Sequence, residues 1–154
     1  MNYEKALGDI KEILESASTN EQALIKVVEY LHDNFSHYSW VGIYLLEDNE
    51  LVLGPWKGAA ATEHARIPVG DGVCGAAAKS GTTEIVPDVS KDSRYLACFI
   101  NTKSEIVVPI NKGNKILGEI DIDSDRISAF SEQDSKFLEN VAALLANKII
   151  PDYA

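Results

Sequence analysis

The segment SEIVVPINKGNKILGEIDIDS, residues 104–124, decides the fold more than any other part of this chain. Strand-forming residues fill two runs, 105–110 and 115–122, and the four residues between them, NKGN, are typical of a turn. The segment therefore predicts an antiparallel β-hairpin.

The second strand of this hairpin alternates acidic and apolar side chains. Asp121 and Asp123 lie two residues apart, so both point to one face of the sheet, while Ile120 and Ile122 point to the other. Taken alone, such alternation is typical of a solvent-exposed strand face. With a thiol and a third carboxylate, Glu105, nearby, it indicates a shared acidic site instead.

The turn decides whether Glu105 shares the face of the two aspartates. A three-residue loop at 111–113, with Gly113 in the left-handed conformation, would pair Ile110 with Asn114 and would place Glu105 on that face. A two-residue loop at 112–113 without a bulge would turn Glu105 to the opposite face. We predict the first arrangement.

Apolar residues recur at helical spacing near both ends of the chain. They predict one helix before residue 18 and a second that begins at a capping box formed by Thr19 and Gln22. A closing helix is predicted to begin near Ser131, with Asp134 three residues on.

The centre of the chain has the pattern of strands and loops. The predicted elements are strands at 40–46, 51–53 and 83–86, a turn at 48–49, a short helix at 76–78 and a long surface loop at 87–98. This order of elements predicts an α+β domain with a mostly antiparallel sheet. We expect the terminal helices to pack on one face of the sheet and a ligand pocket to lie on the other.

The length of 154 residues and the net charge of -10 limit what the protein does. The length predicts a single domain over residues 1–154. The negative charge disfavours binding to nucleic acid or to an anionic membrane surface, and no basic stripe offsets it. Neither a secretory signal nor a disulfide framework is recognisable, and no apolar run is long enough for a membrane span. We therefore expect a cytoplasmic protein with reduced thiols.

Cys74 and Cys98 are the two cysteines of the chain. Cys74 lies within GDGVCG, residues 70–75, where the glycines allow another group to approach the sulfur closely. Taken singly, cysteines are more often small buried hydrophobes than nucleophiles. The two cysteines and three histidines match no zinc-binding spacing, so we expect no metal site and no cofactor.

Trp40 and Tyr44 share one face of the first predicted strand. Gly42 lies between them and carries no side chain, which would leave space for a small ligand. In isolation both aromatic residues are ordinary strand residues that would lie in the core.

Seven segments, in order along the chain, form a wider pattern. They are WVGIYL (40–45), LGPWKG (53–58), RIPVG (66–70), GVCG (72–75), AC (97–98), SEIVVP (104–109) and DIDS (121–124). Together they resemble the free methionine-(R)-sulfoxide reductases that are built on a GAF domain. The resemblance implies a GAF fold and a cytoplasmic enzyme that reduces free L-methionine-(R)-S-oxide to L-methionine. It also implies thioredoxin or a similar thiol reductant as a partner, and assembly as a homodimer.

The resemblance also implies a role for each matching residue. Cys98 corresponds to the nucleophile and Cys74 to a partner thiol. The substrate-binding residues it implies are the carboxylate cluster of Glu105, Asp121 and Asp123, and the aromatic wall of Trp40 and Tyr44 around the substrate methyl group.

The sequence differs from this family at the position of one further cysteine and around the position of the nucleophile, where the preceding segment RYL, residues 94–96, is also not the family pattern. Where the family has a further cysteine, this chain has His64, or Thr62 if the local loop is longer, and neither is a thiol. Phe99 follows the position of the nucleophile, where the family has an acid. Cys74 is therefore the one thiol within the chain that is left to resolve an oxidised Cys98, and an external thiol is the other route.

Two other function classes are compatible with the residues. A noncatalytic GAF module would bind a small molecule or sense redox state without turnover. A structural dimerisation domain would have no substrate-sized cavity beside Cys98. Production of free methionine from its R-sulfoxide distinguishes the reductase from both.

Overall fold

The computed structural model describes residues 2–62, 64–95 and 101–153, with side chains through Lys148. The elements are α1 (Tyr3–Ser16), α2 (Asn20–Asn34), β1 (Trp40–Glu47), β2 (Glu50–Lys57), β3 (Arg66–Pro68), α3 (Gly72–Ser80), β4 (Glu84–Val86), a 3-10 turn (Val89–Lys91), β5 (Ser104–Lys112), β6 (Lys115–Ser124) and α4 (Glu132–Tyr153). This order confirms the predicted α+β class. No helix within the described residues combines the length and apolarity needed to cross a bilayer.

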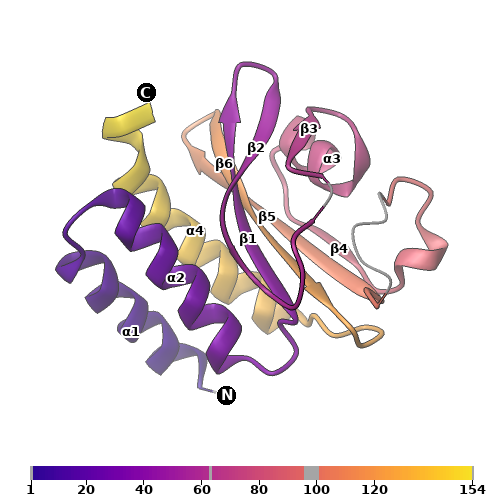
Figure 1. The fold of residues 1–154 in the computed structure, drawn as a ribbon, viewed down its shortest axis with the longest axis horizontal. Helices are drawn as coiled ribbons and strands as arrows, with labels where there is room; N and C mark the ends of the chain where they lie inside the picture. Colours follow the sequence, from indigo (N-terminus) through magenta and orange to yellow (C-terminus); the bar gives the residue numbers. More distant parts are fainter. Residues whose placement is uncertain (1, 63, 96–100, 154) are drawn as a thin grey trace.

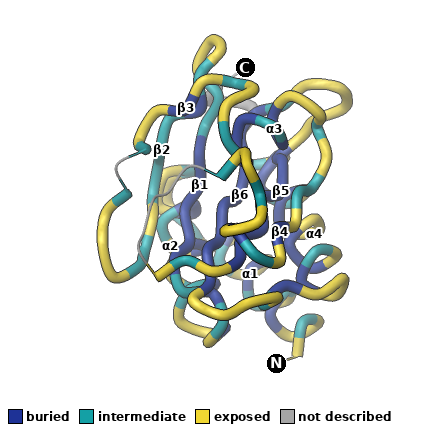
Figure 2. The backbone as a smooth tube through the Cα atoms, turned by 90° about the vertical axis from the view of Figure 1, so that its right-hand side faces the viewer, coloured by how far each residue is buried: buried dark blue, intermediate teal, exposed yellow. Residues whose placement is uncertain are grey.

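The six strands form one sheet in the order β3-β2-β1-β6-β5-β4, and each neighbouring pair runs antiparallel. In Figure 1 the helices α1, α2 and α4 lie on one side of this sheet and α3 lies on the other. The central strands β1, β6 and β5 are buried along most of their length, as Figure 2 shows. A strand buried on both faces must satisfy two different environments.

Alternate residues of the central strands supply the face that packs against α1, α2 and α4. The strand residues in this larger core are Val41, Ile43, Ile106, Val108, Ile110, Leu117, Ile120 and Ile122. Ile120 and Ile122 therefore lie opposite the two aspartates, as the alternation predicts. A smaller core on the other face contains Trp40, Tyr44 and Val107 beneath Cys74 and Ala77 of α3.

Asp134 connects the helical layer to the sheet. Its carboxylate accepts hydrogen bonds from the hydroxyl groups of Tyr38 and Tyr3, from Nε2 of His37 and from the backbone N–H of Ser131, at 2.6–3.2 Å. Burial alone would raise the pKa of Asp134, but the hydrogen bonds outweigh this effect and hold it well below its usual range. Because Ser131 Oγ accepts from the Asp134 N–H in return, this pair caps α4 as predicted.

The predicted cap of the second helix is confirmed as well. Thr19 is the N-cap residue of α2, and its side chain accepts a hydrogen bond from the backbone N–H of Gln22. The turn at Asp48 and Asn49 also forms as predicted, because Glu47 pairs with Glu50 across it.

Two predicted boundaries were wrong, and one strand was not predicted. The strand predicted at 51–53 continues to Lys57, because pairing with β1 extends β2 through Gly54 and Pro55 despite their low strand propensity. The short strand β3 was not predicted, because a run of three residues is too short to show the alternation of apolar and polar side chains that marks a strand. The helix predicted at 76–78 begins at Gly72, so Cys74 lies in its first turn rather than in the preceding loop.

The β5–β6 turn also differs from the prediction. Lys112 pairs with Lys115 across a two-residue turn, so Ile110 does not pair with Asn114. Gly113 does adopt a left-handed conformation, at φ 59°. A register shift next to Ile110 inserts one extra residue into β6 and pairs Glu105 with Asp123. Glu105 therefore lies on the predicted face, but a two-residue turn with a bulge places it there instead of the predicted three-residue loop.

Gly118 in β6 is required by the close approach of β1. A Cβ atom at Gly118 would lie 2.2 Å from the backbone oxygen of Tyr44, far inside a van der Waals contact. We expect Gly118→Ala to destabilise the protein by about 1–3 kcal/mol, since the two central strands would have to separate. Urea unfolding measures the change.

The matched control is Gly8→Ala on the exposed side of α1, where an added Cβ would meet no atom within 4 Å. Alanine there should stabilise the helix by about 0.5–1 kcal/mol. Equal unfolding midpoints for the Gly118→Ala protein and the parent would contradict the prediction.

Candidate functional site

Four acidic side chains lie on the face of the sheet that carries α3. Glu105 projects from β5, and Glu119, Asp121 and Asp123 project from β6; none is more than 4% exposed. The register that pairs Glu105 with Asp123 places both on one face, which confirms the predicted facing of Glu105. Glu119 was not predicted, although it lies two residues before Asp121 and the same alternation would have found it.

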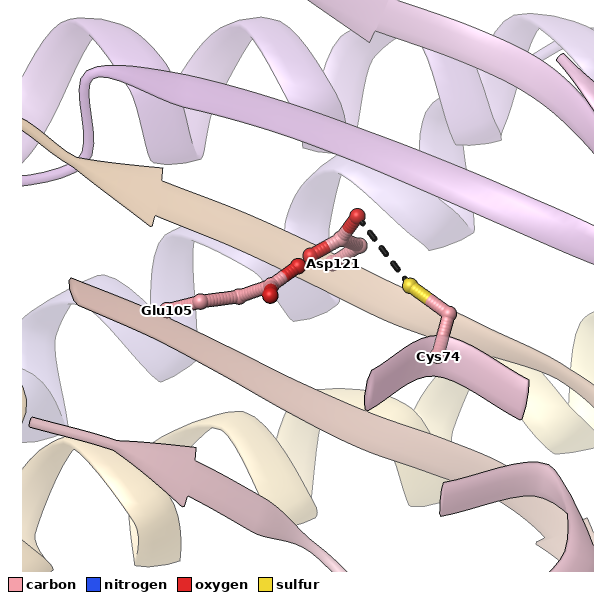
Figure 3. Close-up of side chains that lie close together, drawn as sticks. All are labelled: Cys74, Glu105 and Asp121. Carbon is pink, nitrogen blue, oxygen red and sulfur yellow. Dashed lines mark hydrogen bonds between the residues drawn. The ribbon is translucent and has the colours of Figure 1, made fainter. Parts of the chain in front are cut away.

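Cys74 faces these carboxylates from α3, the helix that covers this side of the sheet. It projects from the first turn of α3 toward β6, and its Sγ donates a hydrogen bond to Oδ2 of Asp121 at 3.3 Å (Figure 3). One side-chain donor atom each from Cys74, Glu105 and Asp121 lie within 4.8 Å of one another. Gly75 permits this placement of α3, because a Cβ there would lie 2.7 Å from the backbone oxygen of Pro68.

No described lysine, arginine or histidine forms an ion pair with any of the four carboxylates. Four of their buried oxygens also accept no hydrogen bond within the described part of the chain: Oε1 and Oε2 of Glu119, Oδ1 of Asp121 and Oδ1 of Asp123. Buried polar atoms are nearly always paired in folded proteins. The cluster therefore has the composition of a site for a cationic group.

Burial raises the pKa of all four carboxyl groups and of the Cys74 thiol. The charge of Asp121 raises the pKa of Glu105, Glu119 and Asp123 further, because like charges at close range oppose a second ionisation. Hydrogen bonds from Glu105 and Cys74 act in the opposite direction on Asp121. Burial and repulsion from Asp121 therefore favour the protonated forms of Glu105, Glu119 and Asp123, and burial favours the protonated form of the Cys74 thiol.

The aromatic residues lie as predicted on the carboxylate face, but the space between them is filled. A Cβ at Gly42 would lie 2.4 Å from the ring of Trp40, so that ring covers Gly42 and the space predicted there for a ligand is occupied. Trp56 stacks on the outer side of Trp40 with ring centroids 6.2 Å apart. The Tyr44 hydroxyl donates to the backbone oxygen of His64 at 2.8 Å.

Cys98 and Phe99 lie outside the residues that the structure describes. The predicted proximity of Cys98 to the carboxylates thus stays a prediction. Thr62 and His64, the two candidates for the missing cysteine position, are joined by a hydrogen bond in which Thr62 Oγ1 accepts from the His64 backbone N–H.

The burial of Glu119 raises its pKa, and this has a measurable consequence for stability. A carboxyl group whose pKa is raised in the folded state adds most to stability below its unfolded pKa of about 4.3, and this contribution is lost as pH rises toward the folded pKa. At pH 8 the free energy of unfolding of Glu119→Gln, measured with urea, should therefore exceed that of the parent by about 1–3 kcal/mol. The difference should vanish near pH 4. Glu47→Gln, at the exposed end of β1, is the control. A Glu119→Gln protein that is equally or less stable at pH 8 would exclude this account.

Comparison with known proteins adds evidence of a different kind. The GAF domain family matches residues 19–149. The chain is 41% identical to GAF domain-containing protein A of Dictyostelium discoideum over 146 residues, 94% of this chain and 90% of that protein. It is 40% identical to the free methionine-R-sulfoxide reductase of Escherichia coli (strain K12) over 115 residues, 75% of this chain and 68% of that enzyme.

A solved structure shows the same likeness in three dimensions. The free methionine-R-sulfoxide reductase from Neisseria meningitidis, crystallised in complex with its substrate, superposes with a TM-score of 0.90 at 33% identity. The match covers 96% of this chain and 88% of that chain. The chain therefore belongs to the GAF domain family and, within it, stands close to the free methionine-R-sulfoxide reductases.

Proposed function

We propose that this protein reduces free L-methionine-(R)-S-oxide to L-methionine, with Cys98 as the nucleophile. The observation that carries the proposal is the buried cluster of Glu105, Glu119, Asp121 and Asp123, which contains oxygens without partners and no paired cation among the described residues. A free amino acid brings an ammonium group to such a site, whereas a methionine residue within a peptide does not. Identity of about 40% to a reductase of this specificity supports the same assignment.

The substrate would be bound at both ends. An ionised carboxylate of the cluster pairs with the ammonium group, because a charge-assisted hydrogen bond is strong in a buried site. Trp40 and Tyr44, on the same sheet face, form the apolar wall against the methyl group at sulfur. Trp56 stacks on Trp40 and fixes the orientation of this wall.

The chemical step needs a proton and a thiol. A carboxylic acid of the cluster protonates the sulfoxide oxygen, and Cys98 sulfur attacks the substrate sulfur. The attack forms a bond between the two sulfur atoms while the oxygen is still on the substrate sulfur. The oxygen then passes to the Cys98 sulfur as the S–S bond and the substrate S–O bond both break, so methionine leaves as the thioether and Cys98 becomes a sulfenic acid. Substrate sulfur is reduced by two electrons and Cys98 is oxidised by two.

Recycling would use Cys74. Its thiol condenses with the sulfenic acid to form a Cys74–Cys98 disulfide and water, and a thioredoxin-type dithiol reduces this disulfide. Because burial raises the pKa of the Cys74 thiol, its proton needs an acceptor. Asp121, hydrogen-bonded to the sulfur at 3.3 Å, is placed to take it. We further propose that the enzyme works in the cytoplasm and as a homodimer.

One observation favours a noncatalytic binding module as a second candidate. The chain carries His64 or Thr62 at the position where the reductases have a further cysteine, so the set of thiols available for recycling is smaller. Such a module would bind methionine sulfoxide in the same cluster without converting it.

Substitution of each cysteine tests the reductase. Cys98→Ser should form no methionine from the R-sulfoxide above background with either dithiothreitol or thioredoxin. Cys74→Ser should still form about one equivalent of methionine per chain in a single turnover, while steady-state turnover with thioredoxin falls by at least about tenfold. Chromatographic quantification of free methionine measures both.

Ala76→Ser, in the same helix as Cys74, is the matched control and should leave turnover unchanged. Turnover that survives Cys98→Ser would reject Cys98 as the nucleophile. Binding without any methionine production by the parent protein would favour the noncatalytic module.

A further inference from the structure

We propose that Cys74, Glu105 and Asp121 bind a divalent metal ion of the thiophilic class, such as Zn²⁺ or Cd²⁺. We infer that the ion occupies the position that the proposed function gives to the substrate ammonium group and thereby blocks the site. The shared position of the ion and the ammonium group rests on the proposed function, whereas the metal site itself does not.

The first argument is geometric. The three donor atoms lie within 4.8 Å of one another, and each comes from a different element: α3, β5 and β6 (Figure 3). The Cys74 Sγ to Asp121 Oδ2 distance is 3.3 Å. A tetrahedral zinc ion with a Zn–S bond of about 2.3 Å and a Zn–O bond of about 2.0 Å separates its sulfur and oxygen ligands by about 3.5 Å. The spacing between the Cys74 and Asp121 ligand atoms thus needs only a small adjustment.

The second argument is the set of buried oxygen atoms around the three ligands that lack hydrogen-bond partners among the described residues. Oδ1 of Asp121, Oδ1 of Asp123 and both carboxylate oxygens of Glu119 are buried and accept no hydrogen bond within the described residues. Glu119 is fully buried, and Asp123 is 3% exposed. Metal binding releases to solvent the protons that its three ligands carry, and the two positive charges of the ion offset the charges of the Cys74 thiolate and of one carboxylate ligand.

The ligand set selects the class of metal. A thiolate with two carboxylates favours Zn²⁺ and Cd²⁺ over Mg²⁺ and Ca²⁺, which prefer sites made only of oxygen atoms. A search of the sequence for zinc-ligand spacing misses this set, because Cys74 and Asp121 are 47 residues apart and meet only when α3 covers β6.

A cadmium titration tests the site directly. In the reduced Cys98→Ser protein, Cys74 is the one remaining thiol. Cd²⁺ should produce the ultraviolet thiolate-to-cadmium charge-transfer absorption, which saturates at one ion per chain. The Cys74→Ser, Cys98→Ser double variant should lose this absorption. Asp121→Asn in the Cys98→Ser background should raise the Kd for Cd²⁺ by at least about tenfold.

The matched control is Asp125→Asn, which removes an exposed carboxylate at the end of β6 and should leave the Kd unchanged. Glu105→Gln gives a second measurement if Asp121→Asn fails to fold, as judged by circular dichroism. Absorption that persists in the double variant would overturn the proposal. Equal Kd values for both aspartate variants, or for Glu105→Gln and Asp125→Asn, would overturn it as well.

Competition separates the metal site from the proposed function. Free methionine-(R)-S-oxide should raise the apparent Kd for Cd²⁺ in the Cys98→Ser protein, in which no turnover consumes the sulfoxide. An unchanged Kd at saturating sulfoxide would overturn the shared position while the absorption still supports the metal site. Methionine production by the metal-free parent protein is measured separately, so failure of the reductase leaves the cadmium result intact.

Discussion

The burial of four carboxyl groups beside one thiol, without a paired cation among the described residues, is the constraint on which the rest of this structure depends. Removal of a carboxylate from water costs several kcal/mol unless it keeps its proton or gains a partner. The larger core on the other side of the sheet, formed with α1, α2 and α4, offsets this cost. The apolar core on the helical side of the sheet thus supports the face that carries the buried acids.

Both halves are built from the same strands. In β6, the isoleucines at 120 and 122 pack against the helices while Asp121 and Asp123 face α3, so a shift of one residue in register would bury the acids in the apolar core. The bulge beside Ile110 matters for the site, because it shifts the strand pairing by one residue and so brings Glu105 to the same face as the aspartates. Gly118 fixes the same register from the other side, where β6 passes close to the backbone of β1.

The face to which each strand residue points can be predicted well from the sequence, whereas the contacts between separate elements cannot. The facing of Asp121, Asp123 and Glu105 follows from a period of two, although the loop expected to produce it was the wrong one. Glu119 obeys the same period and was missed because no motif drew attention to it. The approach of Cys74 to Asp121 and the Trp40 ring above Gly42 depend on how α3 and β2 pack, which no local pattern encodes. The placement of Cys98 belongs to the part of the chain that the structure does not describe.

A site of this kind couples folding, protonation and ligand binding. Because burial raises the pKa of these carboxyl groups, the folded state holds their protons to a higher pH than the unfolded chain does, and a proton is the smallest cation that satisfies the cluster. Under the proposals above, a substrate ammonium group or a metal ion would supply positive charge in its place and would stabilise the folded state by an amount that grows with its affinity and its concentration. Either one lowers the pKa of the remaining carboxyl groups and drives protons out. In the proposed reaction a carboxyl group must retain a proton for the sulfoxide oxygen, so the number of acids matters: one carboxylate binds the ammonium group, and at least one neighbour remains protonated by repulsion from it.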